Sequence, residues 1–280
     1  MSYKIALDSC GELTADMKAD PHFVSVPLTI QVGDLHIVDD ESFNQAAFLK
    51  AVAACPEPAK TACPSPDKYR EAFDDPQADH VYAVTLSGAL SGSYNSALLG
   101  REITLEDHPD KKIHVFNSRS ASVGQTLIAL KIQELEEQGF DFDTVVRLVE
   151  EYIASQKTWF ILENLETLRK NGRLSNLKAK MATMLRIRPV MTSTPEGSIE
   201  QLCQARGSNK AMVMMADDIA HREKNEGPKR VGISHCSNPE RAEMVRDALM
   251  ARMQVSDVVL VDTGGISSTY ANDGGIIVVV

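Results

Sequence analysis

The chain has 280 residues, of which 43% are hydrophobic and 24% charged, as in an ordinary globular protein with room for one or two cores. Its formal net charge of −10 argues against a nucleic-acid-binding surface, which needs a basic stripe. No apolar run is long enough to span a bilayer, and five scattered cysteines form no paired motif. We therefore expect a cytoplasmic protein without a membrane segment.

The first part of the chain alternates short apolar strands with helices. Strands are predicted over residues 4–7, 24–32, 81–84 and 112–116, and helices over 14–18, 43–54, 67–73, from 94 onward, 124–137 and 143–156. Pro27 indicates an edge strand or an irregular course for the second strand, and residues 33–38 predict a hairpin turn and its partner. The alternation predicts a parallel sheet with crossover helices.

The pattern changes after Lys157. Strands are predicted over residues 159–162, 230–235, 257–262 and 275–280, helices over 164–170, 177–185, 210–221 and 239–252, and a hairpin over 186–202. Hairpins pair antiparallel strands. We therefore predict an α/β protein with a parallel-sheet βα domain over 1–157 and an α/β domain with a mixed or antiparallel sheet over 158–280.

A loop rich in serine and glycine, residues 85–93, joins the strand at 81–84 to the following helix. Free backbone N–H groups and hydroxyls at the start of a helix favour an anion. The alternative is that Ser91 or Ser93 simply caps that helix, as serine often does. The phosphate-binding, dinucleotide-binding and hydrolase motifs are excluded because Gly88 and Gly92 have the wrong spacing and no Lys follows Gly92. The loop is thus a candidate anion-binding site without an evident nucleophile motif.

Other polar residues follow the predicted strands or stand in stiff loops. Asp8 and Ser9 come directly after the first strand, where a ligand crevice forms in parallel sheets, although Asp8 also suits a turn. Four prolines between positions 56 and 66 hold residues 60–66 extended. Thr61, Cys63 and Ser65 there are either a second wall for the anion or only a turn in which Ser65 caps the next helix.

Six segments in a fixed order resemble the DegV family over essentially the whole chain. They are Asp8-Ser9, Thr61-Ala62-Cys63-Pro64-Ser65, Leu90-Ser91-Gly92-Ser93-Tyr94-Asn95-Ser96-Ala97, Phe116-Asn117-Ser118, the run from Leu165 to Leu174, and Arg188-Pro189-Val190. The resemblance implies a fatty-acid-binding protein, not an enzyme, that holds one long acyl chain non-covalently in a tunnel between two domains. It also implies that the carboxylate is presented to a separate bacterial fatty acid kinase, which makes an acyl phosphate for phospholipid synthesis.

The resemblance also assigns site residues. It places the ligand carboxylate at Thr61, Ser91, Gly92 and Tyr270, and a surrounding set of residues at Asp8, Ser9, Ala62, Cys63, Ser65, Ser93 and Ser118. Ala62 stands where the family commonly has a serine, and Tyr270 where it has a histidine. A phenol can still donate a hydrogen bond to a carboxylate, but it adds no positive charge at neutral pH.

Two sets of side chains have both a functional and a structural interpretation. The basic residues Arg169, Lys170, Arg173 and Arg206 would contact the kinase or the phosphate, or else form a solvated helix end. The methionines Met181, Met184, Met191, Met212, Met214 and Met215 would line an adaptable tunnel, or else belong to an ordinary core.

Two alternatives remain open. One is an acyl-transfer enzyme or hydrolase with Cys63 or Ser91 as nucleophile, and the other is a binder of a different small anionic ligand. His, Cys and carboxylate residues show no metal-ligand spacing, so we expect neither a metal nor a cofactor. The ligand that the resemblance implies is a long-chain fatty acid.

Overall fold

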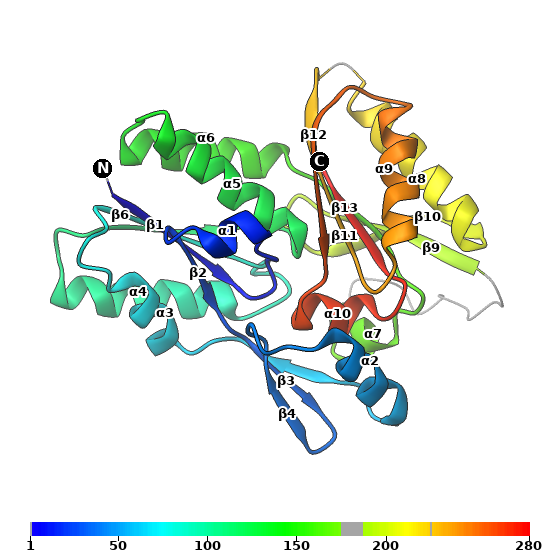
Figure 1. Cartoon of the computed structure of the whole chain (residues 1–280), viewed down its shortest axis with the longest axis horizontal. Helices are drawn as coiled ribbons and strands as arrows, with labels where there is room; N and C mark the ends of the chain where they lie inside the picture. Colours follow the sequence, from blue (N-terminus) through cyan, green and yellow to red (C-terminus); the bar gives the residue numbers. More distant parts are fainter. Residues whose placement is uncertain (1, 175–186, 225) are drawn as a thin grey trace.

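The computed structural model describes residues 2–174, 187–224 and 226–280, and the first part of the chain forms a parallel sheet (Figure 1). Its strands are β1 (Tyr3–Asp8), β2 (Phe23–Val26), β6 (His80–Thr85) and β7 (Lys112–Asn117), in the order β2-β1-β6-β7. The strand order reverses at β1, so the loops that follow β1 and β6 diverge and leave a crevice at the carboxyl edge of the sheet. The predicted parallel sheet is confirmed.

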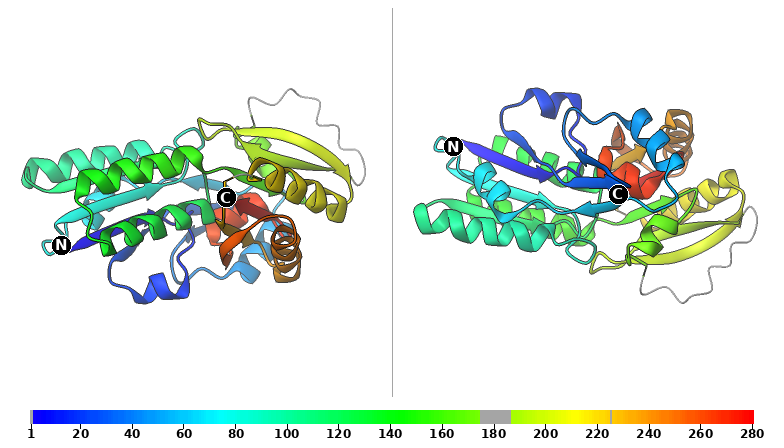
Figure 2. Two further views of the ribbon diagram at one scale, coloured as in Figure 1. Left: turned by 90° about the horizontal axis from the view of Figure 1, so that it is seen from above. Right: turned by 90° about the horizontal axis from the view of Figure 1, so that it is seen from below.

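Helices cover both faces of this sheet (Figures 1 and 2). One face packs against α3 (Pro66–Phe73) and α4 (Ser93–Asp107), and the other against α1 (Ala15–Ala19), α5 (Val123–Glu137) and α6 (Phe142–Ser155). In β6, Val81 and Ala83 point to the first face while Tyr82 and Val84 point to the second. The strand is therefore apolar at consecutive positions, as expected of a sheet covered on both sides.

The second sheet is mixed, as the sequence predicts. Its order is β10-β9-β8-β13-β11-β12, with β8 (Thr158–Ile161), β9 (Ile187–Ser193), β10 (Ile199–Arg206), β11 (Lys229–His235), β12 (Val255–Asp262) and β13 (Ile276–Val279). Only β11 and β12 are parallel, and the other neighbouring pairs are antiparallel. Lys157 and Val280 exchange backbone hydrogen bonds beside β8 and β13, and the division of the chain at residue 157 stays a prediction.

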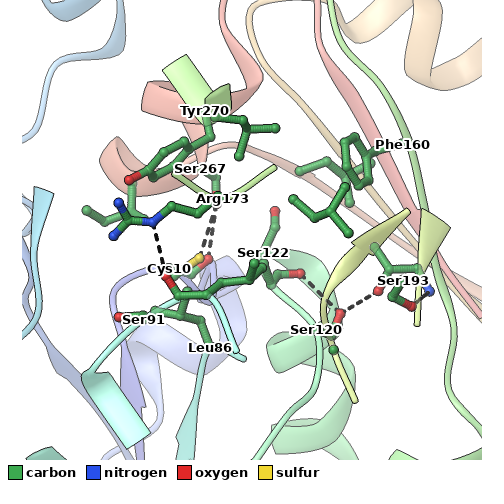
Figure 3. Close-up of a pocket in the computed structure, with 18 of the residues that line it drawn as sticks. Cys10, Leu86, Ser91, Ser120, Ser122, Phe160, Arg173, Ser193, Ser267 and Tyr270 are labelled. Atoms are coloured by element: carbon green, nitrogen blue, oxygen red, sulfur yellow. Dashed lines mark hydrogen bonds between the residues drawn. The ribbon is translucent and has the colours of Figure 1, made fainter. Parts of the chain in front are cut away.

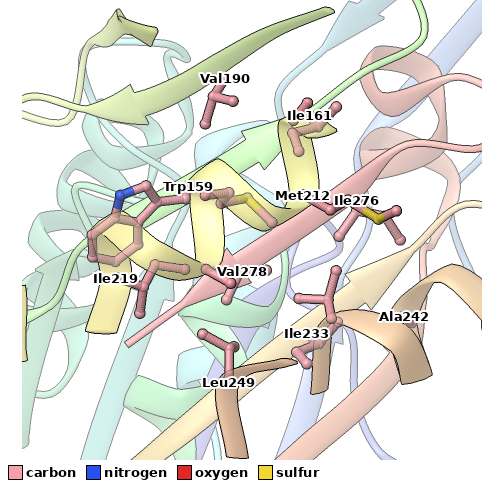
Figure 4. Close-up of a cluster of buried hydrophobic side chains, with 14 of the residues drawn as sticks. Trp159, Ile161, Val190, Met212, Ile219, Ile233, Ala242, Leu249, Ile276 and Val278 are labelled. Atoms are coloured by element: carbon pink, nitrogen blue, oxygen red, sulfur yellow. The ribbon is translucent and has the colours of Figure 1, made fainter. Parts of the chain in front are cut away.

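The core of the second sheet forms under α8 (Ser208–Arg222) and α9 (Pro239–Met250) (Figure 4). Trp159 is fully buried there, and its indole N–H donates to Asp218 at 2.9 Å. Met212 and Met215 belong to this core and Met191 to a neighbouring cluster, so these methionines are core residues rather than tunnel lining. Met181, Met184 and the helix predicted over 177–185 lie outside the described residues.

Helix α5 lies between the two sheets. Its side chains Val123 and Leu127 form a cluster with Val279 of β13, while Ile128 and Ile132 pack on the parallel sheet. A Cβ at Gly232 of β11 would lie 2.8 Å from Val123, so the helix and the second sheet approach closely. Ten of the fifteen residues of α5 are buried, which is why its sequence shows no clean amphipathic period.

A small antiparallel sheet, β4-β3-β5, lies beside these two sheets. It consists of β3 (Thr29–Val32), β4 (Leu35–Val38) and β5 (Lys60–Ala62), and it packs near α2 (Gln45–Ala54), α7 (Glu166–Lys170) and α10 (Gly265–Ala271). The strand predicted over 24–32 is two strands in different sheets, because Pro27 has no N–H for a ladder. Across the described residues, no helix has the length and apolar character needed to cross a membrane.

Candidate ligand-binding site

A cavity lies between the carboxyl edge of the parallel sheet and the second sheet (Figure 3), and about 110 Å³ of it is open to the centre of a water-sized sphere. The loops after β1, β6 and β7 form one wall, and β8, β13, α7, α10 and the β9–β10 turn form the other. Its surface is mostly apolar, contributed by Leu28, Leu86, Leu90, Phe160, Leu162, Leu168, Ile199, Ile266 and Ile277. Such a surface suits a hydrocarbon ligand better than a small polar one.

Polar groups gather at one end of the cavity. The hydroxyl groups of Tyr270 and Thr61 are 2.8 Å apart, and the Arg173 guanidinium carbon lies 6.0 Å from the centre of the Tyr270 ring. Arg173 donates through Nε to the Leu90 carbonyl oxygen at 3.2 Å, which brings it next to Ser91. Figure 3 shows Tyr270, Arg173 and Ser91 together at one side of the cavity. One hydroxyl of the Thr61–Tyr270 pair donates to the other, so the pair has one free O–H, and together with the Ser91 hydroxyl and the guanidinium it can bind a carboxylate.

The opposite end also contains hydroxyl groups, but these bond to the protein. Phe160, Ser120 and Ser193 lie at this side of the cavity (Figure 3). The hydroxyl oxygens of Ser120 and Thr158 are 2.6 Å apart, and the Thr158 amide donates to Ser193 Oγ at 3.1 Å. Their pairing leaves methylene and methyl groups to form most of the wall there.

The structure separates the predicted basic cluster. Arg173 lines the cavity, whereas Arg169 and Lys170 are exposed on α7, and Arg169 pairs with Glu166 at 2.8 Å. Arg206 is exposed at the end of β10, where it lines a separate hollow with Arg188, Gly207 and Ser208. Of these four residues, Arg173 alone is thus placed to meet a ligand in the cavity.

Of the other predicted site residues, Thr61, Ser91 and Tyr270 line the cavity. The remaining predicted residues are not part of its wall: Asp8, Ser9, Ala62, Cys63, Ser65, Gly92, Ser93 and Ser118. Ala62 and Cys63 are exposed, and the Cys63 sulfur lies 3.3 Å from where a Cβ on Gly92 would be, so the proline loop touches the start of α4. Ser65 caps α3 by accepting from the Lys68 amide.

Three further predicted residues hold loops in place. Ser93 is buried, with its hydroxyl 2.8 Å from the Tyr69 hydroxyl. Ser118 donates to the Ser120 carbonyl oxygen at 3.0 Å and so folds the loop after β7. Ser9 donates to the buried carboxylate of Asp39 at 2.9 Å. These hydroxyls shape the wall without touching the cavity.

Asp8 is fully buried where the strand order reverses. Its carboxylate accepts hydrogen bonds from the Leu86 amide and from Gln125 Nε2, both at 2.8 Å, and thereby joins the ends of β1 and β6 to α5. Burial raises the pKa of this carboxyl group to about 6, and the hydrogen bonds oppose that rise. Asp8 thus has a structural role: it holds the ends of β1 and β6 to α5 beneath the cavity wall.

Replacing Asp8 by asparagine should change the pH dependence of stability. Because the folded pKa of about 6 exceeds the ordinary value of 3.8, the folded state binds more protons than the unfolded state between these values, and stability falls as pH rises through them. At ~1.4 kcal/mol per pKa unit, the wild type should lose roughly 3 kcal/mol relative to Asp8→Asn across this window. Urea unfolding of both proteins at pH 4 and pH 7 measures the difference. Asp34→Asn on the exposed β3–β4 turn is the control, and its stability relative to the wild type should be the same at both pH values. If the stability of Asp8→Asn relative to the wild type is also the same at pH 4 and pH 7, the raised pKa of Asp8 is contradicted.

Two residues in the loop after β7 that line the cavity have left-handed backbone conformations. Arg119 has φ of 50° and Ser122 has φ of 58°. The Ser122 hydroxyl donates to buried Glu12 at 2.8 Å and lies 2.7 Å from the Ser234 hydroxyl on β11. Burial raises the pKa of Glu12 to about 7. The serine-rich run signalled a loop here, but nothing in the sequence singled out Glu12.

The alternative with a catalytic nucleophile finds little support in the geometry. Ser91 lines the cavity, but its Oγ accepts from the Ser93 amide at 3.2 Å, and the described residues of the cavity wall include no histidine to act as a base. Among the described wall residues the only thiol is that of Cys10, whose pKa is raised well above its usual value by burial, whereas Cys63 is exposed and not part of the wall. Within the described ranges, no three His, Cys, Asp or Glu side chains are grouped to hold a metal ion.

Comparison with known proteins gives a consistent result. The family model described as "Uncharacterised protein, DegV family" matches residues 2–280. A crystal structure of a DegV family protein from Ruminococcus gnavus, refined with vaccenic acid, is 53% identical with a TM-score of 0.97 and covers 100% of both chains. The Streptococcus pneumoniae fatty acid kinase B3 protein, loaded with linoleic acid, is 36% identical with a TM-score of 0.88, covering 100% of this chain and 99% of that one.

A third solved structure is a DegV family protein from Eubacterium eligens loaded with heptadecanoic acid. It is 28% identical, has a TM-score of 0.88 and covers 99% of both chains. The family model spans almost every residue, and the similarity of these structures extends over both sheets. The chain belongs to the DegV family.

Proposed function

We propose that this protein binds one long-chain fatty acid non-covalently, with its carboxylate at Thr61, Ser91 and Tyr270 and its hydrocarbon in the apolar cavity. The observation that carries the proposal is a mostly apolar cavity with hydroxyl groups and a guanidinium at one end. The vaccenic, linoleic and heptadecanoic acids held by the three relatives support the same ligand class.

The energetics favour such a division between chain and head group. Burial of each methylene contributes about 0.8 kcal/mol, so a chain of ten or more methylenes supplies most of the affinity. The carboxylate needs partners chiefly because an unpaired buried charge costs several kcal/mol. Thr61, Ser91 and Tyr270 supply neutral donors, and Arg173 beside the Tyr270 ring supplies the positive charge that a phenol lacks.

We further propose that the bound acid is presented to a separate kinase for acyl phosphate formation, in the cytoplasm and toward phospholipid synthesis. Arg169 and Lys170 are exposed on α7, whose following residues lead to Arg173 at the polar end of the cavity, and they would contact that kinase. In this view residues 1–157 carry the head-group loops, and residues 158–280 cover the acyl chain.

The test begins with the lipid that accompanies the purified protein. Organic extraction and mass spectrometry should find a free long-chain fatty acid, while the intact denatured protein keeps its unmodified mass. Adding ATP and a bacterial fatty acid kinase catalytic subunit should then convert the bound acid to an acyl phosphate. A covalent acyl adduct would favour the acyl-transfer alternative. Failure of the lipid-free protein to bind linoleic or vaccenic acid in a titration would refute the proposal.

A further inference from the structure

Helix α10 carries Tyr270 to the polar end of the cavity, but its sequence lacks a side chain that caps its N-terminus. Its cap is Gly264, which offers no side chain, and its first residue is Gly265. Glycine at the start of a seven-residue helix leaves backbone N–H groups without local partners. The helix therefore depends on groups from elsewhere in the chain.

The buried carboxylate of Asp39 supplies those partners. The Gly265 amide donates to Asp39 Oδ1 at 2.7 Å, and the Ile266 amide donates to Oδ2 at 2.9 Å. Asp39 follows β4 and is only 4% exposed, so its charge meets the positive end of the helix away from water. A Cβ at Gly265 would lie 2.5 Å from Oδ1, which explains why glycine stands there.

Asp39 is itself held in place. Ser9 donates to Asp39 Oδ2 at 2.9 Å, and the Ser9 hydroxyl accepts from the Leu28 amide at 3.0 Å. A chain of hydrogen bonds thus runs from Leu28, between β2 and β3, through Ser9 and Asp39 to the beginning of α10. Both ends of this chain belong to segments that line the cavity, through Leu28 and Ile266.

The other end of α10 is where the ligand would lie. Ile266, Ser267, Tyr270 and Ala271 line the cavity, and the Tyr270 hydroxyl is bonded to Thr61. Because α10 has only seven residues, a shift at its first turn moves Tyr270 relative to Thr61. Asp39 itself is not part of the cavity wall.

From this arrangement we infer that Asp39 is a positioning residue for head-group binding: it fixes the start of α10 so that Tyr270 meets the ligand carboxylate beside Thr61. The inference rests on the proposed function. Asparagine at position 39 keeps the shape but offers one acceptor oxygen to two N–H donors and turns an NH₂ group toward one of them. The start of α10 then keeps its hydrogen bond from the Gly264 amide to Glu12 at 3.3 Å but loses the pair of carboxylate bonds that fixes its first turn.

The test compares an acid with its ester in Asp39→Asn. Linoleic acid and methyl linoleate share the hydrocarbon chain, but the ester lacks the carboxylate, so only the acid reports on the head-group contacts. We expect the dissociation constant for the acid to rise about tenfold and that for the ester to stay within about twofold. The matched control is Asp40→Asn, the same change at an exposed neighbouring residue, which should leave both constants unchanged.

Each outcome decides the inference. Equal weakening of acid and ester binding would mean that Asp39 only supports the fold. Unchanged binding of both would mean that Asp39 does not position Tyr270. Either result overturns the inference while the proposed function stands. If Asp39→Asn does not fold, Ser9→Ala removes one hydrogen bond to the carboxylate and should weaken acid binding alone, by about threefold. In a Tyr270→Phe background, Asp39→Asn should add little further loss. A wild-type protein that binds neither ligand refutes both proposals.

Discussion

Replacing both Thr61 and Ser91 by alanine is expected to raise the dissociation constant for a long-chain fatty acid at least about a hundredfold. Each hydroxyl lines the polar end of the cavity, and a hydrogen bond to a charged group contributes roughly 1.5–3 kcal/mol. Removing both leaves the carboxylate with Tyr270 and Arg173 as its remaining partners. Calorimetric titration of the lipid-free protein with linoleic acid measures the change.

The matched control removes the same two kinds of hydroxyl far from the cavity. Thr144 and Ser155 lie at the two ends of α6, where each bonds to a neighbour within three residues. Thr144→Ala with Ser155→Ala should leave the affinity unchanged. Unaltered affinity in the Thr61 and Ser91 variant, with a normal unfolding transition, would place the carboxylate elsewhere in the cavity.

Replacing Gly197 by valine is expected to lower the free energy of unfolding by about 2–4 kcal/mol. Gly197 lies in the β9–β10 turn with φ of 83°, which valine tolerates poorly, and its carbonyl oxygen accepts from Ser87 at 2.8 Å. A Cβ there would lie 2.7 Å from the Arg119 Cα and collide with the Ser87 hydroxyl oxygen. Both neighbours belong to loops of the first sheet, so the variant should also separate the two cavity walls and weaken fatty acid binding.

Gly139→Val separates backbone strain from this collision. Gly139 has φ of 79°, but nothing lies within 4 Å of where its Cβ would be. Urea unfolding should show that Gly139→Val loses only the strain, roughly 1–3 kcal/mol, and binds fatty acid normally. If the two variants lose equal stability and both keep normal binding, the β9–β10 turn does not hold the cavity closed.

Local sequence patterns predicted most of the regular elements. The apolar runs of β1, β6 and β7 and the hairpin of β9 and β10 are found where they were expected, because each combines strong β-formers with clear turn residues. Helix α10 was not predicted. Its run from Gly264 to Thr269 has weak helix propensity, and a carboxylate more than two hundred residues away stabilises its start.

The residues of the candidate site could be predicted from the sequence only in part. Thr61, Ser91 and Tyr270 come from three distant segments of the chain. The resemblance of these segments to the DegV family assigned all three residues to one site. Asp39 and Glu12 carried no signal, since each looks like a surface acid beside a turn, and only the packing of both sheets buries them. Arg173 looked like the exposed end of a basic helix, but its guanidinium bends back to Leu90 and the cavity.

The positive φ angles of Arg119 and Ser122 affect how a ligand fits against the cavity wall. Conformations of this kind cost about 1–3 kcal/mol each in residues other than glycine, and the folded protein maintains both in one short loop of the cavity wall. Folding supplies this free energy, so both conformations are present before a ligand binds. An acyl chain bound as we propose therefore packs against a loop whose backbone conformation is set before binding, so this wall favours some chain shapes over others.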